Sequence, residues 1–311
     1  MRRTGFVVMP GFQVMSFAAL TAFEIANLVL DTPFYDLRML SEGGGLVRSS
    51  FGMMIDTMPI HDSRFDTIIV GGELYVQPSS AGLLARLQDA SGISRRTASI
   101  CTGAFVLAEA GLLDGRNATT HWAYARELQA GYPMVRVEMD RIFIADGNVW
   151  TSAGMSAGVD LALGMIEEDL GRDMAGKVAK RLVLYQRRSG GQSQHSALLE
   201  LEPKSDRIQK ALIYAKENLA KPLSVADLAQ VACLSVRQFT RAFTAETGQS
   251  PAKAIEMLRT ETARAMMEDG HYPIETVAST TGFNDRERMR RAFLRAFGQP
   301  PQAIRRNVQS V

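Results

Sequence analysis

The order of strand-like and helix-like segments changes at Gly171, and this change constrains the fold more than any other feature of the chain. Before that residue, short apolar runs typical of buried strands alternate with segments whose apolar residues recur at helical spacing. The expected strands are 4–9, 34–40, 65–72 and 97–101, and the expected helices are 16–30, 80–90, 102–113 and 156–171. A hairpin is expected at 141–154, turning on Asp146-Gly147. After Gly171 the strand-like runs stop, so we expect two domains of different class.

The first domain, residues 1–188, is expected to form an open, mostly parallel α/β sheet sandwiched by helices, in the flavodoxin-like arrangement. Strands that alternate with helices along a chain pair in parallel. Residues 189–206 are polar, rich in glycine and serine and contain a proline, which is typical of a linker. Residues 207–311 predict an all-α domain. A length of 311 residues fits two domains of ordinary size.

Charge and cysteine content limit the classes of partner and compartment. The formal net charge is +2, but residues 205–311 hold 16 lysines and arginines against 11 aspartates and glutamates. The C-terminal part is therefore the one expected to bind a polyanion. Two cysteines far apart in sequence, Cys101 and Cys233, exclude a disulfide framework and suit a reducing cytoplasm. The chain shows no apolar run of about 18 residues and no signal peptide, so we expect a cytoplasmic protein that does not span a membrane.

Residues 223–251 predict two short helices joined by a tight turn, which is the pattern of a helix-turn-helix unit. Ser224 is expected to cap the first helix and Ser235 the second, whose buried positions are Phe239 and Phe243. The outward positions of the second helix are Arg237, Gln238, Thr240 and Arg241. Cys233, in the same segment, is expected to belong to the core.

The same pattern recurs at 273–301, with Gly282 as the turn, Asn284 as the cap and an apolar stripe on the last helix. Residues 251–270 lie between the two units. As a helix of roughly 18 residues this segment would span about 27 Å. Successive major-groove faces on one side of a duplex lie about 34 Å apart. The sequence therefore predicts two recognition helices held about one DNA turn apart, although a plain helical bundle with solvated arginines remains the alternative.

This part of the chain resembles the AraC family of transcription regulators over about 100 residues. The resemblance is carried by Gly282, Phe283, Phe293, Phe297, Gly298 and Pro301, with Met289 where an aromatic residue is usual. It implies contacts with an operator in double-stranded DNA, where arginine suits guanine and glutamine suits adenine. The implied DNA-binding residues are Arg237, Gln238, Thr240, Arg241, Arg286, Glu287, Arg288 and Arg291.

In the first domain, three loops are expected to meet at the carboxyl ends of the strands, where ligands bind in open α/β sheets. They are 71–74, the turn at Cys101, and 151–156. Cys101 lies between a strand and the start of a helix, a position at which the helix dipole lowers a thiol pKa. The alternative is a cysteine that serves only as a small buried apolar residue. His121, twenty residues later, is the nearest candidate base, and its alternative is a hydrogen-bond partner at a strand end.

The segment from Cys101 to Trp122 resembles the PfpI-like domain of the class I glutamine amidotransferase-like superfamily. It is especially similar to the sensor half of GlxA-like regulators, which join that domain to an AraC-type one, so the resemblance covers nearly the whole chain. Two departures bear on catalysis. The acidic residue that enzymes of the superfamily place near the cysteine aligns with Met15, which cannot transfer a proton. The histidine that protease-like members carry directly after the cysteine is replaced by Thr102.

These observations favour a sensor in which Cys101 is not catalytic. A small effector, such as an amine, an amino acid or a betaine, is expected to bind among Gly72, Glu73, Cys101, Thr102 and His121. The resemblance implies a homodimer that acts as an activator, with RNA polymerase as a further partner. The alternatives are a cysteine-dependent hydratase or amidase fused to a DNA-binding domain, and a redox sensor. No metal site or cofactor is expected, because His61, His195 and His271 lack ligand spacing.

Overall fold

The computed structural model describes residues 1–60, 64–184, 188, 190, 193, 194, 201–269 and 272–304. The chain divides into two compact units, Met1–Gln194 and His195–Val311. Half of the expected linker lies outside the described residues, as do His61, His195 and His271. Among the residues that are described, no helix is both long and apolar enough to cross a membrane.

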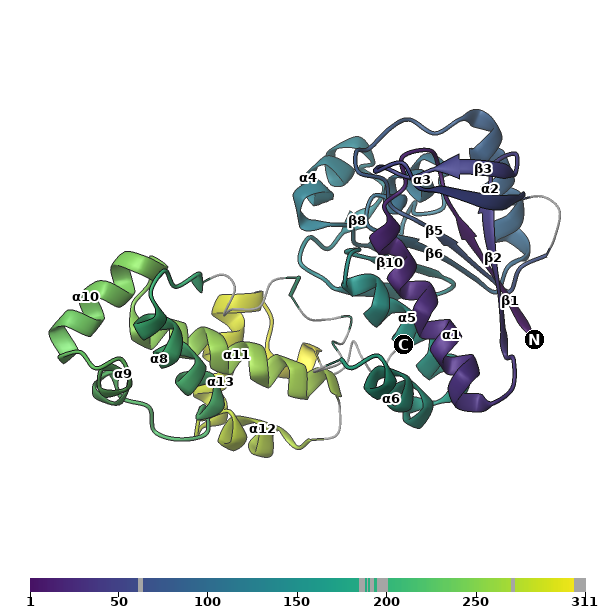
Figure 1. The fold of residues 1–311 in the computed structure, drawn as a ribbon. Helices are drawn as coiled ribbons and strands as arrows, with labels where there is room; N and C mark the ends of the chain where they lie inside the picture. Colours follow the sequence, from purple (N-terminus) through teal and green to yellow (C-terminus); the bar gives the residue numbers. More distant parts are fainter. Residues whose placement is uncertain are drawn as a thin grey trace. The chain divides into compact units, whose positions relative to one another are not determined.

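The first unit is built on an eight-stranded sheet (Figure 1), with strand order β3-β4-β2-β1-β5-β6-β10-β9. Its strands are β1 (Arg2–Val7), β2 (Tyr35–Ser41), β3 (Gly45–Arg48), β4 (Met54–Pro59), β5 (Thr67–Val70), β6 (Arg96–Ile100), β9 (Phe143–Asp146) and β10 (Val149–Ser152). A short parallel pair, β7 (Asn117–Ala118) and β8 (Arg136–Val137), forms a separate two-stranded sheet. Neighbouring strands from β4 to β10 run parallel, and only the edge strands β3 and β9 are antiparallel to their neighbours. The expected open, mostly parallel sheet is confirmed.

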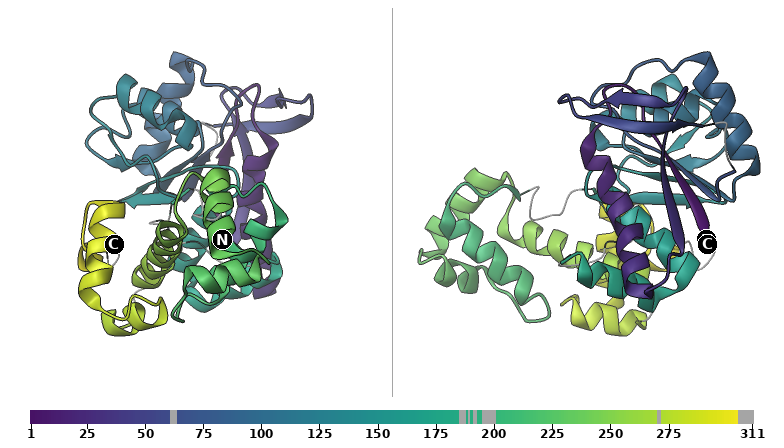
Figure 2. Two further views of the ribbon diagram at one scale, coloured as in Figure 1. Left: turned by 90° about the vertical axis from the view of Figure 1, so that its left-hand side faces the viewer. Right: turned by 45° about the vertical axis from the view of Figure 1, so that its right-hand side comes forward.

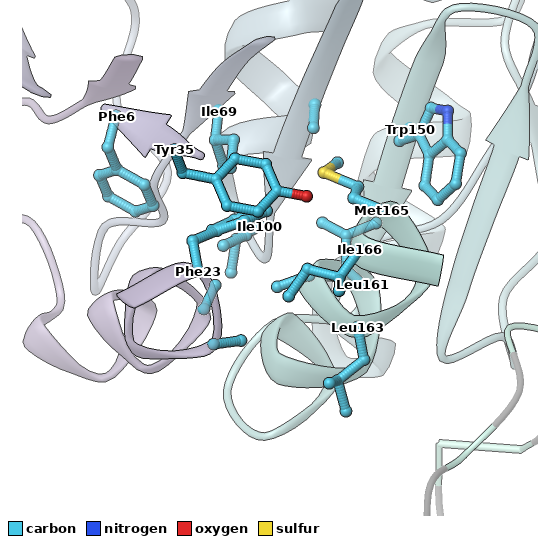
Figure 3. Packing of buried hydrophobic residues seen from close by; sticks show 14 of the residues in the cluster. Phe6, Phe23, Tyr35, Ile69, Ile100, Trp150, Leu161, Leu163, Met165 and Ile166 are labelled. Carbon is cyan, nitrogen blue, oxygen red and sulfur yellow. The ribbon is translucent and has the colours of Figure 1, made fainter. Parts of the chain in front are cut away.

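Helices cover both faces of this sheet, as two further views show (Figure 2). Their bounds are η1 (Val14–Phe17), α1 (Ala18–Leu30), α2 (Ala81–Ile93), α3 (Gly103–Glu109), α4 (Trp122–Gly131), α5 (Ala157–Leu170) and α6 (Arg172–Arg181). One apolar cluster joins α1, α5 and α6 to alternate strand residues such as Phe6, Ile69 and Ile100 (Figure 3). A second joins α2, α3 and α4 to Val7, Ile68 and other residues of the opposite face. The strand period of two thus divides the core into two layers.

Several elements of the first unit were not indicated by the sequence, among them the ribbon β3–β4, the pair β7–β8 and helix α4. The edge ribbon β3–β4 follows the glycine-rich turn at 41–45, and its strands expose Leu46, Met54 and Met58. Helix α4 begins after His121, whose ring nitrogen takes the place of an ordinary capping oxygen. The hairpin that turns on Asp146-Gly147 is present as β9–β10. Gly147 adopts a positive φ of 60° there, as a tight hairpin turn requires.

The described part of the second unit is helical. Its helices are α8 (Asp206–Glu217), α9 (Val225–Val231), α10 (Val236–Thr247), α11 (Pro251–Asp269), α12 (Ile274–Thr280) and α13 (Arg286–Phe297). Helix α11 has 19 residues and so spans about 28 Å. Its first half, with Ala254 and Leu258, joins the cluster of α8, α9 and α10, and its second half, with Ala263 and Met267, joins that of α12 and α13. The expected helix between two helix-turn-helix units is therefore present.

Candidate functional site

Cys101 directly follows strand β6 and has a left-handed backbone conformation, with a φ of 56°. Such a conformation is uncommon for a residue other than glycine and persists only where the surroundings fix it. The surroundings here are two hydrogen bonds. The N–H of Cys101 donates to the carbonyl oxygen of Ser152 at 3.0 Å, and its own carbonyl oxygen accepts from the hydroxyl of Thr120 at 2.8 Å. Nothing in the sequence marks Thr120 as part of this site.

Two glycines enclose Cys101 from neighbouring loops. A Cβ atom on Gly72 would lie 2.9 Å from the Cβ of Cys101, and one on Gly154 would lie only 2.2 Å from it. Both distances are shorter than any real contact, so only glycine lets these loops approach so closely. The expected meeting of the loops 71–74 and 151–156 at Cys101 is therefore observed.

Thr102 ties the cysteine turn to the loop after β5. Its hydroxyl accepts from the N–H of Glu73 at 2.8 Å and donates to the carbonyl oxygen of the same residue at 2.9 Å. Ser16 holds the other side of that loop, because its hydroxyl accepts from the N–H of Gly72 at 3.3 Å. Met15 precedes Ser16 in the short helix η1 and is 48% exposed.

The thiol of Cys101 is buried, and burial raises its pKa to about 11, with a backbone hydrogen bond from Thr102 opposing the shift. The expectation of a lowered thiol pKa is therefore wrong. Helix α3 has only seven residues. Desolvation of the thiolate outweighs whatever its N-terminus contributes to stabilising that charge.

The carboxyl group of Glu73 is half-buried. Burial, and after it the negative charge of Glu109 at the end of α3, together raise its pKa to about 7. The backbone of Glu73 is thus hydrogen-bonded to Thr102, while its carboxyl group experiences the negative charge of Glu109. This carboxyl group changes charge near neutral pH and would be stabilised in its charged form by a cation.

His121 forms the N-cap of α4, with its Nδ1 atom accepting from the N–H of Ala123 at 3.3 Å. Its ring also lies against Trp122 and Tyr124. The preceding residue, Thr120, makes the contact with Cys101. The Nδ1 atom of His121 therefore has a backbone partner at the start of a helix, and not at the strand end that the alternative named.

In the second unit, α9 and α10 form the first helix-turn-helix, and Ser224 and Ser235 cap them as expected. Phe239 and Phe243 are fully buried. The opposite face of α10 is exposed and forms an open depression lined by Val236, Arg237, Thr240, Arg241, Thr244 and Ala245. Among the described residues, neither Arg237 nor Arg241 has an ion-pair partner.

Two residues of this unit differ from expectation. Cys233 is exposed and adopts a left-handed conformation in the turn, so the prediction that it belongs to the core is wrong. Gln238 completes the capping box of α10, because its side-chain oxygen accepts from the N–H of Ser235 at 3.2 Å. That oxygen already has a partner, whereas reading an adenine would use both ends of the amide.

The second helix-turn-helix consists of α12 and α13. Its N-cap is Asp285, whose carboxylate accepts from the N–H of Glu287 at 2.9 Å, and not Asn284 as the sequence predicts. Asn284 instead adopts a left-handed conformation with a φ of 58°. This second turn ends one residue later than expected, because asparagine tolerates that conformation and aspartate is an equally good cap.

The arginines of α13 are more heavily paired than those of α10. Arg286 donates to Glu275 at 2.7 Å, and Arg290 forms a two-pronged pair with Glu287 at 2.9 Å for each bond. Arg288 and Arg291 are exposed and have no ion-pair partner among the described residues. The eight sequence-predicted residues therefore lie on the exposed faces of two helices, but they differ in how freely they can turn to a new ligand.

Comparisons with known proteins agree with this division. Residues 29–168 match the DJ-1/PfpI family, and residues 228–307 match a helix-turn-helix domain. The HTH-type transcriptional regulator GlxA of Rhizobium meliloti is 30% identical over 99% of this chain and 97% of its own length. An isonitrile hydratase of Pseudomonas putida is 39% identical over 44% of this chain and 60% of its own length.

Among solved structures, an AraC family transcriptional regulator from Pseudomonas putida matches 58% of this chain and 100% of its own. The TM-score is 0.54 and the identity is 23%, so this likeness shows the fold alone. The similarity to GlxA extends through both units and nearly the full length of both proteins. The chain therefore belongs to the family of HTH-type transcriptional regulators, in which a DJ-1/PfpI domain precedes an AraC-type helix-turn-helix domain that binds DNA.

Proposed function

We propose that this regulator binds a small molecule at the Cys101 end of its sheet, and that binding changes its affinity for an operator. The observation that carries the proposal is the enclosure of Cys101 by the loops of Gly72 and Gly154, at the edge where open α/β sheets bind ligands. The residues proposed to form the site are Gly72, Glu73, Cys101, Thr102 and His121. Thr120 is added to this set because it contacts Cys101.

Glu73 narrows the chemistry of the effector. The pKa of its carboxyl group is about 7, so this group is only partly ionised at neutral pH. A cationic nitrogen bound beside it would lower that pKa, and the resulting carboxylate would form an ion pair with the ligand. An amine, an amino acid or a betaine has such a nitrogen. This electrostatic match supports the nitrogenous effectors that the resemblance implies.

We propose that Cys101 is not a catalytic nucleophile. With a thiol pKa of about 11, the reactive thiolate makes up only about one part in ten thousand at pH 7. Met15, in the position of the superfamily acid, cannot relay a proton. The identity to an isonitrile hydratase favours the second candidate function, a cysteine-dependent hydratase or amidase. Turnover of an isonitrile or an amide by the purified protein would establish that candidate.

The second unit is proposed to contact the operator through α10 and α13. The principal contacts are proposed to be the four arginines that have no ion-pair partner within the described residues, Arg237, Arg241, Arg288 and Arg291. Further contributors are Gln238, Thr240, Arg286 and Glu287, each of which must first give up an internal hydrogen bond or ion pair. A homodimer that activates transcription with RNA polymerase in a cytoplasmic setting completes the proposal, on the strength of the family resemblance.

A thermal-shift screen of the full-length protein against small nitrogenous metabolites tests the effector site. A ligand that binds only the folded state raises the unfolding midpoint by mass action. The shift should shrink in Glu73→Gln, which removes the carboxylate proposed to attract the cationic nitrogen without adding volume, and persist in Glu217→Gln, the same change in the other unit. A shift of equal size in Glu73→Gln would place the binding elsewhere.

A further inference from the structure

Gln194 is the last residue of the first unit, and its side-chain amide is fastened to the loop that precedes α4. Its Oε1 atom accepts from the N–H of Trp122 at 2.8 Å, and its Nε2 atom donates to the carbonyl oxygen of Thr120 at 2.9 Å. The same Nε2 atom lies 3.1 Å from the carbonyl oxygen of Arg141. The backbone N–H of Gln194 donates to Asp140 at 2.8 Å.

Thr120 links this contact to the candidate site. Its hydroxyl donates to the carbonyl oxygen of Cys101, and its own carbonyl oxygen accepts from Gln194. Two hydrogen bonds through one fully buried residue therefore connect the cysteine turn with the point where the chain leaves the first unit. A ligand that displaced the Cys101 backbone would therefore strain the hydrogen bond to Thr120 first, and through Thr120 the hydrogen bond to Gln194.

A second fastening lies six residues earlier in the chain. The side chain of Arg188 donates to Asp160 at 2.7 Å and to the hydroxyl of Ser156 at 2.9 Å, and its backbone N–H donates to Asp160 at 3.0 Å. Ser156 belongs to the loop in which Gly154 packs against Cys101. The end of the first unit is thus bonded at two places near the cysteine turn. Arg188 binds the segment that follows β10, and Gln194 binds the loop that precedes α4.

We propose that Gln194 is the positioning residue through which the occupancy of the Cys101 site reaches the DNA-binding unit. This inference rests on the proposed function. In one arrangement the amide of Gln194 stays bonded to Thr120 and Trp122, and in the other a ligand-shifted Thr120 releases it. A ligand shifts such an equilibrium by its differential affinity for the two arrangements, and operator DNA must affect the cysteine site reciprocally.

The reciprocal effect gives a test that needs no known effector. The full-length protein is alkylated with iodoacetamide in the presence and absence of a duplex that it has itself selected from a random library. The modification rate of Cys101 is followed by the mass of its peptide, which separates it from Cys233. We expect DNA to change that rate by about fivefold or more, the lower end of common allosteric couplings.

Gln194→Met should abolish the DNA effect on Cys101 while the variant still binds the duplex, because it keeps the side-chain length and loses every hydrogen bond of the side-chain amide. Gln194→Glu keeps an acceptor for Trp122 but no donor for Thr120, so it should also lose the effect. Gln129→Met is the matched control. Gln129, in α4, forms an equivalent amide clamp to Val135 and Val137, and none of these contacts involves Cys101 or Thr120.

Persistence of the DNA effect in both folded Gln194 variants would overturn the role of Gln194 while leaving the proposed function standing. Absence of any DNA effect in the parent protein, with DNA binding intact, would overturn both. Loss of the effect in Gln129→Met as well would show a general loosening of the unit and would also count against Gln194.

Discussion

The hydroxyl of Thr102 and the backbone of Glu73 form a closed pair of hydrogen bonds, one in each direction, at 2.8 and 2.9 Å. This pair joins the loop after β5 to the cysteine turn after β6. Thr102→Val should therefore leave two backbone groups of Glu73 without partners and lower the free energy of unfolding by about 1–3 kcal/mol. Denaturant unfolding measures the loss. Thr102→Ser retains the hydroxyl, so an equal loss in that variant would show that the methyl group, and not the hydrogen bonds, carries the stability.

The approach of Gly154 to Cys101 can be separated from the backbone conformation of Gly154. Gly154 and Gly111 both have a positive φ, of 83° and 69°, but an added Cβ meets Cys101 at 2.2 Å in the first case and only Asp114, at 3.9 Å, in the second. Both alanine variants suffer the conformational strain. Gly154→Ala should therefore be less stable than Gly111→Ala by about 1–3 kcal/mol, the usual cost of overpacking. Equal unfolding free energies would contradict the close packing at Cys101.

The raised pKa of Cys101 determines how stability depends on alkaline pH. The folded-state value of about 11 exceeds the ordinary value of 9.0, so folding favours the protonated thiol. The stability contribution is fully present below about pH 9 and is lost as the pH rises toward 11. The unfolding free energy of the parent should thus fall more steeply between pH 8.5 and 10.5 than that of Cys101→Ala. Parallel pH profiles would rule out a buried, protonated thiol.

DNA binding should distinguish free arginines from paired ones. Arg241→Ala and Arg291→Ala each remove an exposed guanidinium that has no ion-pair partner among the described residues, and each should weaken binding by about 1–3 kcal/mol, or roughly 5- to 150-fold. Arg295→Ala is the control, because Arg295 pairs with Glu256 at 2.9 Å in the last turn of α13. Gel-shift titrations at one fixed salt concentration measure the difference. Similar losses for all three variants would indicate contacts through net charge alone.

The fold of the first unit was predictable where a strand is buried on both faces. Strands β5 and β6 are short runs of buried residues, and each continues into a glycine-bearing turn, so composition alone locates them. The ribbon β3–β4 lies at the edge of the sheet and exposes more than half of its residues, and its mixed composition carries no clear period. The place of this ribbon in the sheet depends on the pairing of β4 with β2, which a local sequence pattern does not indicate.

The candidate site was predictable to the extent that topology determines it. Parallel strands bring their carboxyl ends to one edge, so the meeting of the Gly72, Cys101 and Gly154 loops follows from the alternation of strands and helices. The direction of the thiol pKa shift did not follow, because it depends on burial by residues from several elements. The hydrogen bonds of Gln194 to Thr120 and Trp122 were not predictable either. Gln194 lies in a polar segment whose composition indicates a linker, and composition does not show where a single side-chain amide will bind.

Helix α11 contributes side chains to two apolar clusters, one with α8–α10 and one with α12–α13. Removal of either cluster would leave one half of α11 with its apolar residues in water. The two helix-turn-helix units are therefore expected to melt in a single cooperative transition. A mutation that unfolds one helix-turn-helix unit would therefore unfold the other as well. A folded form with a single intact recognition helix, able to bind only half of the operator, would not accumulate.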